Sequence, residues 1–336
     1  MRIEQNYSLL KHNTFGLDVK TKYFVEYENE EDLKKLLSDE YFFSQAFWHI
    51  GQGSNLLFLS DFDGVIVHSA IAGIDIVQED DDYVWLKAGA ANDWDSFVAY
   101  CVDKGWGGLE NLSNIPGEVG ASAVQNIGAY GVEASDVITE VHAYNIETGE
   151  KQIFDNPACN YSYRHSFFKE TENKGKYYVT HVVYKLSKKP DFQLDYGNLK
   201  ECLKDNPVTV QNVRDAVIAI RAAKLPDPKV IGNAGSFFMN PYVCIEHFQS
   251  LQNKYPNIPH YPIDEKVVKI PAAWLIDKCN LKGETLGGAA ISEKQPLVIV
   301  NQNNATGDEI ALLAENVREA VKEKFGIELQ PEVNYI

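Results

Sequence analysis

The chain contains 336 residues, of which 45% are hydrophobic, and its formal net charge at pH 7 is −17. This length indicates two or three domains, and the acidic charge disfavours nucleic acid or an anionic membrane as a partner, since both select Lys/Arg surfaces. The five cysteines are far apart and the eight histidines lack metal-ligand spacing, so we expect buried free thiols and no metal site. No signal peptide or membrane span is predicted, which fits the reducing cytoplasm.

The first third of the chain alternates between strand and helix patterns. Asn29 has the side chain of a helix N-cap and precedes leucines at helical spacing. This alternation predicts a mixed α+β protein. Strands are predicted at 23–28, at 45–50 and, with a turn at 79–82, within 65–90; helices are predicted after residue 29 and at 92–106.

The middle of the chain is rich in strand patterns, and the last third is more helical. Residues 137–154 predict a β-hairpin with its turn at Thr148-Gly149, and 177–188 predict another strand. A helix follows Pro207 and ends before Pro226, so we place a domain boundary near Pro207. Further predictions are a loop at 256–271, a short helix within 271–283, and a long helix whose capping box pairs Thr306 with Glu309.

Two glycine-rich loops carry the first functional signal. Gly51–Leu56 is a weak match to GxGxxG and no Walker lysine follows it, so neither a Rossmann NAD site nor a P-loop is supported. The stretch Asn114–Gly131 has four glycines and one charge, Glu118. Small residues at 120–123 let backbone N–H groups face outward, and such groups can bind a pyrophosphate. The loops together favour a dinucleotide site, and a tight helix–sheet crossing is the structural alternative.

Three polar residues stand in apolar surroundings. Arg164 follows aromatic residues in "YSYRHSFFK", and a buried guanidinium needs an anion, either a ligand carboxylate or an internal acid. Ser236 in "GNAGSFF" is a nucleophile, a proton donor or a structural turn serine, and the GxSxG pattern is missing there. Glu332 is a semi-buried carboxylate suited to proton transfer if the last nine residues pack, and a surface residue if they fray.

In this order, these segments resemble the UDP-N-acetylenolpyruvoylglucosamine reductase family, flavoproteins that form UDP-N-acetylmuramate for bacterial peptidoglycan. The resemblance runs from about residue 12 to residue 336. The matching segments are "GQGSNLLF", "NLSNIPGEVGASAVQNIGAYG", "YSYRHSFFK", "KLPDPKVIGNAGSFFMNP", "AAWLIDKCNLKGETLGGAAI" and "QPEVNYI".

The resemblance implies an α+β fold of three domains. Two of them form a vanillyl-alcohol-oxidase-like FAD-binding unit, at 1–72 with 326–336 and at 73–206, and 207–325 form an α+β substrate-binding domain. FAD is expected to bind non-covalently. The implied FAD-binding residues are Gly51, Gln52, Gly53, Ser54, Asn55, Leu56, Pro116, Gly117, Gly120, Ala121, Val124, Asn126, Gly128, Tyr130 and Gly131.

The resemblance also implies a ping-pong mechanism with NADPH as the hydride donor. Flavin N5 then delivers hydride to the enolpyruvyl group, Arg164 and Glu332 stabilise the enolate, and Ser236 protonates the alpha carbon. The expected substrate-binding residues are Tyr163, Tyr196, Lys224, Asn240 and Lys282. "LDYGNL" indicates the branch with a tyrosine loop, and His165 stands where an aspartate is common. We expect a monomer without nucleic-acid or membrane partners.

Two other functions compete with this interpretation. One is an oxidase of the same fold, which often holds FAD covalently through His or Cys, residues that the two loops lack. The other is a non-catalytic protein that binds a nucleotide sugar and carries no flavin.

Overall fold

The computed structural model describes residues 1–204 and 206–336. They pack as two compact units, each built from separate segments of the chain. The first unit contains 1–7, 21–52 and 63–223, and the second contains 8–20, 53–62 and 224–336. The glycine loop Gly51–Leu56 therefore begins in the first unit and ends in the second.

One sheet of the first unit has the strand order β1-β2-β5-β3, and its inner strands carry the buried side chains. Asn29 caps α1 as predicted, since its side chain accepts a hydrogen bond from the backbone N–H of Asp32. The unpredicted strand β1 lies at an edge and is mostly exposed, so it has no apolar stripe to reveal it. The elements are β1 (Arg2–Ser8), β2 (Lys20–Tyr27), α1 (Glu30–Leu37), α2 (Glu40–Phe43), β3 (Phe47–Ile50) and β5 (Phe62–Ser69).

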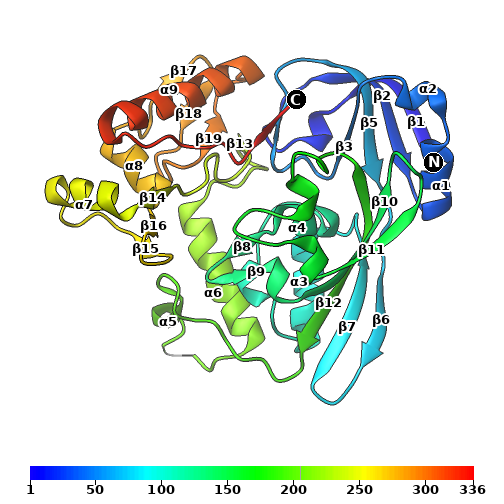
Figure 1. The fold of residues 1–336 in the computed structure, drawn as a ribbon, viewed down its shortest axis with the longest axis horizontal. Helices are drawn as coiled ribbons and strands as arrows, with labels where there is room; N and C mark the ends of the chain where they lie inside the picture. Colours follow the sequence, from blue (N-terminus) through cyan, green and yellow to red (C-terminus); the bar gives the residue numbers. More distant parts are fainter. Residues whose placement is uncertain (205) are drawn as a thin grey trace. The chain divides into compact units, whose positions relative to one another are not determined.

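The second sheet of the first unit is antiparallel, with the order β11-β10-β12-β7-β6 (Figure 1). The predicted hairpin is present, and Gly149 has the positive φ that its turn requires. Buried side chains of α3 and α4 pack in the core of this sheet. The elements are β6 (Ile74–Glu79), β7 (Tyr83–Gly89), α3 (Trp94–Asp103), α4 (Val119–Gln125), β8 (Gly128–Ala129), β9 (Val132–Glu133), β10 (Ile138–Asn145), β11 (Lys151–Asp155), β12 (Tyr177–Ser187), α5 (Leu199–Cys202) and α6 (Val210–Lys224).

The second unit packs α7, α8 and α9 with short strands around one apolar core. Thr306 and Glu309 form the predicted capping box of α9. The elements are β4 (Leu56–Leu57), β13 (Gly232–Asn233), β14 (Tyr242–Cys244), α7 (Ile245–Lys254), β15 (Tyr261–Pro262), β16 (Val267–Lys269), α8 (Ala272–Lys278), β17 (Thr285–Leu286), β18 (Ala289–Ile291), β19 (Ile299–Asn301), α9 (Gly307–Phe325) and β20 (Asn334–Tyr335).

The mixed α+β fold is confirmed, and two details were wrong. The predicted loop at 256–271 contains β15 and β16, which are too short for a periodic signal and which pair with each other. All five cysteines are free, but Cys202 and Cys244 are exposed rather than buried. Among the described residues, no helix combines the length and apolar character needed to span a membrane.

Candidate functional site

Arg164 is held in a strained turn of the first unit. Its φ is +55°, a conformation uncommon for a residue with a long side chain. The turn is closed by reciprocal backbone hydrogen bonds between Ser162 and His165. The guanidinium lies 5.1 Å from the centre of the Tyr163 ring, and its Nη2 donates to the Gly128 carbonyl at 2.6 Å. The turn and these contacts fix where the positive charge is presented.

Two residues that sequence analysis did not assign to this role hold the turn in place. Lys169 Nζ donates to the Arg164 carbonyl at 2.7 Å and to Gln125 Oε1 at 2.9 Å. Asn126 is buried, and its side-chain nitrogen donates to the Ser162 carbonyl at 2.9 Å. Both lie in segments that match the family: Lys169 ends "YSYRHSFFK", and Asn126 was expected to contact FAD rather than to hold this turn.

His165, the departure from the family pattern, points its ring toward a glutamate. Its Nε2 lies 4.0 Å from Glu170 Oε1, and the side chain is 39% exposed. The orientation of Arg164 is therefore set chiefly by Lys169 and by the backbone of the turn.

Tyr130 and Tyr196, both predicted ligand contacts, meet edge to face with their ring centres 6.3 Å apart. Tyr130 is half-buried with φ +50°, whereas Tyr196 is exposed. The buried Asn111 donates to the carbonyls of both Tyr130 and Gln193, at 2.9 and 2.8 Å. One side chain therefore anchors the Tyr130 turn to the segment that leads to Tyr196.

Arg221 on α6 is a further cation that sequence analysis missed. Its Nε donates to the Asn114 carbonyl at 3.0 Å, and its terminal nitrogens have no hydrogen-bond partner within residues 1–204 and 206–336. Burial lowers the pKa of Arg221, the nearby Tyr130 and Asp95 oppose this shift, and Arg164 adds to it. The helical pattern of this segment did not reveal the contact of Arg221. Residue spacing shows which face of a helix is apolar, but it does not show which atoms an arginine side chain contacts.

In the second unit, the structure brings Ser236 and Glu332 together. The backbone N–H of Glu332 donates to the carbonyl of Phe237 at 2.8 Å, and Met239 N–H donates to the Gln330 carbonyl at 3.0 Å. The last residues therefore pack, and the interpretation of Glu332 as a frayed surface residue was wrong. Both Ser236 and Glu332 are half-buried.

The position of Ser236 is set by a buried asparagine. Asn233 Oδ1 accepts from the Gly235 N–H at 2.9 Å, and Gly235 has a φ of +69°. The Ser236 hydroxyl itself has no hydrogen-bond partner among the residues described. It is therefore available to a ligand.

The first glycine loop contacts the C-terminal segment that carries Glu332. Asn55 Nδ2 donates to the Glu332 carbonyl at 3.1 Å, and β4 pairs in parallel with β20. Gly53 has a φ of +70°, and a Cβ there would lie 2.0 Å from the His12 carbonyl oxygen. Within the described part of the chain, the backbone N–H groups of residues 52–55 have no acceptor. Four adjacent free donors are the chemistry that a phosphate needs.

The second glycine loop uses its backbone differently. The N–H groups of Val119 and Gly120 donate to the carbonyls of Asn92 and Ala90, at 3.0 and 2.9 Å. A Cβ on Gly120 would lie 2.9 Å from that of Ala90. These two amides are therefore not available to a ligand, and the structural alternative, close packing, describes them. The predicted contact Val124 likewise uses its carbonyl inside the protein, accepting from the Ser166 hydroxyl at 2.6 Å.

The predicted substrate residues of the second unit differ in what they contact. Asn240 Oδ1 accepts from the Ala272 N–H at the start of α8, and Lys282 Nζ lies 2.8 Å from Asp277 Oδ1. Lys224 is exposed and forms no ion pair among the described residues.

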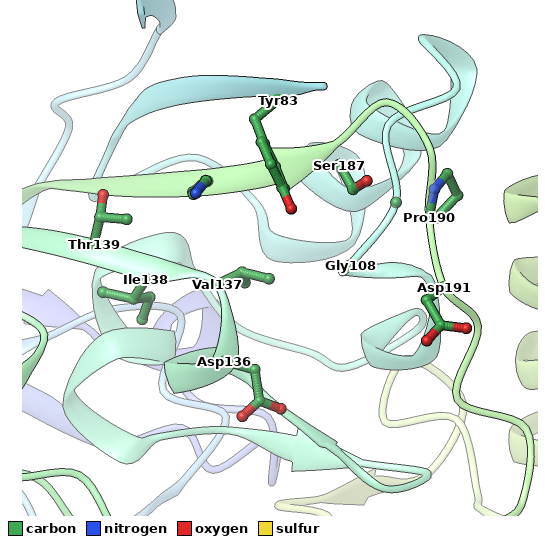
Figure 2. Close-up of a pocket in the computed structure, with 11 residues that line it drawn as sticks. Tyr83, Gly108, Asp136, Val137, Ile138, Thr139, Ser187, Pro190 and Asp191 are labelled. Atoms are coloured by element: carbon green, nitrogen blue, oxygen red, sulfur yellow. The ribbon is translucent and has the colours of Figure 1, made fainter. Parts of the chain in front are cut away.

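A separate pocket lies in the first unit, between the ends of β7, β10 and β12 (Figure 2). It has a volume of about 320 Å³ and is lined by residues such as Tyr83, Asp136, Thr139, Ser187 and Asp191. None of the predicted site residues lines it. The pocket therefore adds nothing to the candidate site.

Comparisons with known proteins find relatives over the full length of the chain. Residues 227–336 match the model of the UDP-N-acetylenolpyruvoylglucosamine reductase C-terminal domain, and 21–153 match an FAD binding domain. A UDP-N-acetylenolpyruvoylglucosamine reductase of Bacteroides fragilis is 52% identical over 335 residues, covering 99% of this chain and 100% of the relative. The chain belongs to the UDP-N-acetylenolpyruvoylglucosamine reductase family. A reductase of Porphyromonas gingivalis is 48% identical over 338 residues, covering 100% of both chains.

A solved reductase structure from Thermus caldophilus has the same fold, with a TM-score of 0.71 at 23% identity, covering 100% of this chain and 99% of that one. As a family member, the chain is an FAD-dependent oxidoreductase. The free N–H groups of residues 52–55 fit the pyrophosphate of that cofactor.

Proposed function

We propose that the protein reduces the enolpyruvyl group of UDP-N-acetylenolpyruvoylglucosamine, with NADPH as the reductant, to form UDP-N-acetylmuramate for peptidoglycan. The full-length identity to reductases supports this substrate. The observation that supports the catalytic assignment is the backbone pairing of Glu332 with Phe237, which brings the Glu332 backbone to the segment that carries Ser236. We further propose a cytoplasmic monomer, in which the three domains keep the boundaries implied by the sequence.

When bound, FAD supplies the hydride. The first glycine loop then offers its free N–H groups to the pyrophosphate, and Asn55 ties this loop to the backbone of Glu332. Gly51–Asn55 thereby connects cofactor binding to the placement of a catalytic side chain. Tyr130 remains a predicted cofactor contact.

Negative charge that develops beside the substrate carboxylate needs a fixed positive partner. Arg164 suits this role because its turn is held by Lys169 and by backbone carbonyls before the substrate arrives. A preorganised donor of this kind typically contributes about 3–4 kcal/mol to transition-state stabilisation. Arg221 adds a second cation near Tyr130, and we assign it to an anionic group of the cofactor or substrate.

Ser236 is assigned the proton transfer to the alpha carbon. A serine hydroxyl is a weak acid, so the reaction depends on the basicity of the carbanion and on a neighbouring group that restores the proton. We assign this role to Glu332, whose backbone pairs with Phe237 next to Ser236. Positioned proton transfer typically contributes about 10²- to 10⁴-fold to the rate.

An anaerobic half-reaction tests the proposal. The flavin is reduced with NADPH, the nicotinamide is removed, and UDP-N-acetylenolpyruvoylglucosamine is added while flavin absorbance is followed. We expect rapid reoxidation, lost in Ser236→Ala with FAD content unchanged, and retained in Ser250→Ala, an exposed serine of α7. Reoxidation by oxygen but not by the substrate would instead indicate an oxidase.

A further inference from the structure

A partly buried cluster of three ionisable side chains lies beside Gly51 of the first glycine loop and has no role in the function proposed above. His68, on β5, places Nδ1 2.9 Å from Glu26 Oε2 and Nε2 3.1 Å from Glu118 Oε1. Glu118, the one charge in the second glycine loop, is 6% exposed. A Cβ on Gly51 would lie 2.8 Å from its other oxygen, Oε2. The carboxylate therefore lies directly against the first loop, and all four residues belong to the first unit.

The geometry of the cluster gives a doubly protonated histidine when both carboxylates are ionised. An ionised carboxylate only accepts hydrogen bonds, so a ring that contacts carboxylates through both nitrogens must carry a proton on each. Burial alone would lower the pKa of His68, but its hydrogen bonds and charge interactions with Glu118 and Glu26 raise it above its ordinary value. Burial has the largest effect on Glu118 and raises its pKa, and the hydrogen bond and charge of His68 only partly oppose that shift. The charge of His68 therefore favours the ionised form of Glu118 and balances it.

Groups on the neighbouring elements do not replace this charge. Arg2 Nε, on β1, lies 3.6 Å from Glu26 Oε1, whereas the His68 ring contacts the other oxygen, Oε2. His49, on β3, stays neutral, since burial lowers its pKa to about 3. Its Nε2 lies 3.0 Å from the hydroxyl of Tyr27, whose pKa burial raises.

The remaining neighbours are an acid and an aromatic ring. Asp93, which precedes α3, pairs with Glu118 through the backbone, and its charge raises the pKa of Glu118. The Asp93 carboxylate also accepts a hydrogen bond from Gln52 Nε2 at 3.0 Å. The Phe24 ring stacks on His68 with 6.1 Å between centres. Glu118 thus lies near the acid Asp93 and against Gly51, and the His68 ring contacts its carboxylate directly.

We propose that His68 is a positioning residue for FAD, because its imidazolium neutralises Glu118 beside Gly51 of the first glycine loop and loss of its proton weakens cofactor binding. This inference rests on the proposed function, which puts the FAD pyrophosphate against the free N–H groups of residues 52–55. A pyrophosphate is anionic, and a Glu118 carboxylate without its counter-charge repels it through a poorly screened interior. The first loop therefore binds the cofactor more tightly while the histidine is charged.

The direction of the pH dependence follows from the raised pKa of His68 in the folded protein. His68 carries its full charge well below the ordinary histidine pKa of about 6.5, and it loses that charge as pH rises through the higher folded value. FAD affinity is therefore expected to fall as pH rises through that value. One lost charge interaction of about 1.4 kcal/mol corresponds to a tenfold weaker dissociation constant.

The test is a titration of the apoprotein with FAD at pH 6 to 9.5, followed by flavin fluorescence. The dissociation constant of the wild type should rise about tenfold across this range. Glu118→Gln keeps the shape and removes the charge, so its affinity should be independent of pH and tighter than wild type at the alkaline end. His68→Gln should bind weakly throughout. His181→Gln, which alters a half-buried histidine 3.5 Å from Glu30, is the matched control and should follow the wild type.

A second readout does not depend on FAD. The imidazole of His68 in the apoprotein, followed by NMR, should titrate above the ordinary value and should shift downward in Glu26→Gln. A flat wild-type FAD profile, or the same alkaline loss in Glu118→Gln, would overturn the inference while FAD binding stands. Absence of FAD binding at every pH would reject the proposed function itself. If His68→Gln fails to fold in a thermal scan, Glu118→Gln and the NMR titration decide alone.

Discussion

The two glycine loops have similar compositions and opposite uses of the backbone. In the first loop, the N–H groups of residues 52–55 have no acceptor within the described chain. In the second loop, Val119 and Gly120 donate to backbone carbonyls of residues 92 and 90. Glycine content therefore signals that something approaches the backbone closely, but it does not say whether a ligand or the protein itself does so.

The largest expected effect comes from Gly53→Ala in the first loop. The new Cβ would lie 2.0 Å from the backbone oxygen of His12, and the φ of +70° adds strain. Backbone cannot move aside as a flexible side chain can, so we expect a cost of about 2–4 kcal/mol. FAD affinity should fall by a hundredfold or more, measured by fluorescence titration.

Gly149→Ala is a matched control that separates backbone strain from steric clash. Gly149 has a φ of +69° and open space around its Cβ position, so Gly149→Ala brings strain alone. It should cost about 1 kcal/mol and leave FAD binding unchanged. Equal losses of FAD affinity in the two variants would show that the approach of Gly53 to His12 is irrelevant to the cofactor.

The next largest effect is expected at Asp95, which holds the start of the second glycine loop through the Asn114 N–H. Arg214 donates to both oxygens of Asp95, at 2.6 and 2.9 Å, and the Asn114 N–H donates to Asp95 Oδ1 at 2.6 Å. Asp95→Asn leaves a buried guanidinium without its counter-charge, which should cost about 2 kcal/mol or more in the free energy of unfolding by urea. Asp82→Asn, which breaks the exposed pair with Lys189, should cost less than about 0.5 kcal/mol.

The same pair gives the wild type an acid-sensitive contribution. Burial would raise the pKa of Asp95, but the hydrogen bonds from Arg214 and Asn114 hold it below its ordinary value. The contribution is therefore present above the ordinary pKa of about 3.9 and is lost as pH falls through the lower folded value. Asp95→Asn should lack this part of the acid dependence. A variant that loses stability between pH 5 and 3 as steeply as the wild type would contradict the assignment.

These contrasts also show what sequence reasoning could predict. The Asn29 cap, the hairpin at Gly149 and the Thr306 capping box depend on neighbouring residues, and all three are confirmed. Arg164, Ser236 and Glu332 stood out because polar side chains in apolar surroundings are unusual. Their catalytic roles and the substrate contacts remain predictions.

The undetected features depend on contacts between distant segments. The pairing of Glu332 with Phe237 and the hydrogen bond from Arg221 to Asn114 join parts of the chain that no periodicity links. The hydrogen bonds of the Val119 and Gly120 amides could likewise not be predicted from the sequence. Their acceptors are the backbone carbonyls of Asn92 and Ala90, and every residue type has such a carbonyl. Side-chain chemistry is visible in a sequence, whereas the partner of a backbone group is not.

A moderate effect is expected from Gly120→Ala in the second loop. Its Cβ would lie 2.9 Å from that of Ala90, in a packed core, so we expect a loss of about 1–2 kcal/mol in unfolding free energy. The FAD dissociation constant of the folded protein should stay within about twofold of wild type, since the Gly120 amide already has an acceptor. Weaker FAD binding at unchanged stability would mean that the second loop also contacts the cofactor through its backbone, and the contrast between the loops would fail.

The smallest effect tests the point where the two loops touch. Gly51→Ala would place a Cβ 2.8 Å from Glu118 Oε2, a side-chain atom rather than backbone. Glu118 is held by His68 but can shift by a few tenths of an ångström, so we expect only a three- to tenfold loss of FAD affinity, about 1 kcal/mol. In a Glu118→Ser background, which removes the obstructing carboxylate, Gly51→Ala should cost almost nothing. A double-mutant cycle measures this coupling directly. Additive effects would mean that residue 51 is a glycine for the sake of the cofactor alone. Coupling would mean that residue 51 must be small because the Glu118 carboxylate, the only charge of the second loop, occupies the space that a side chain would need.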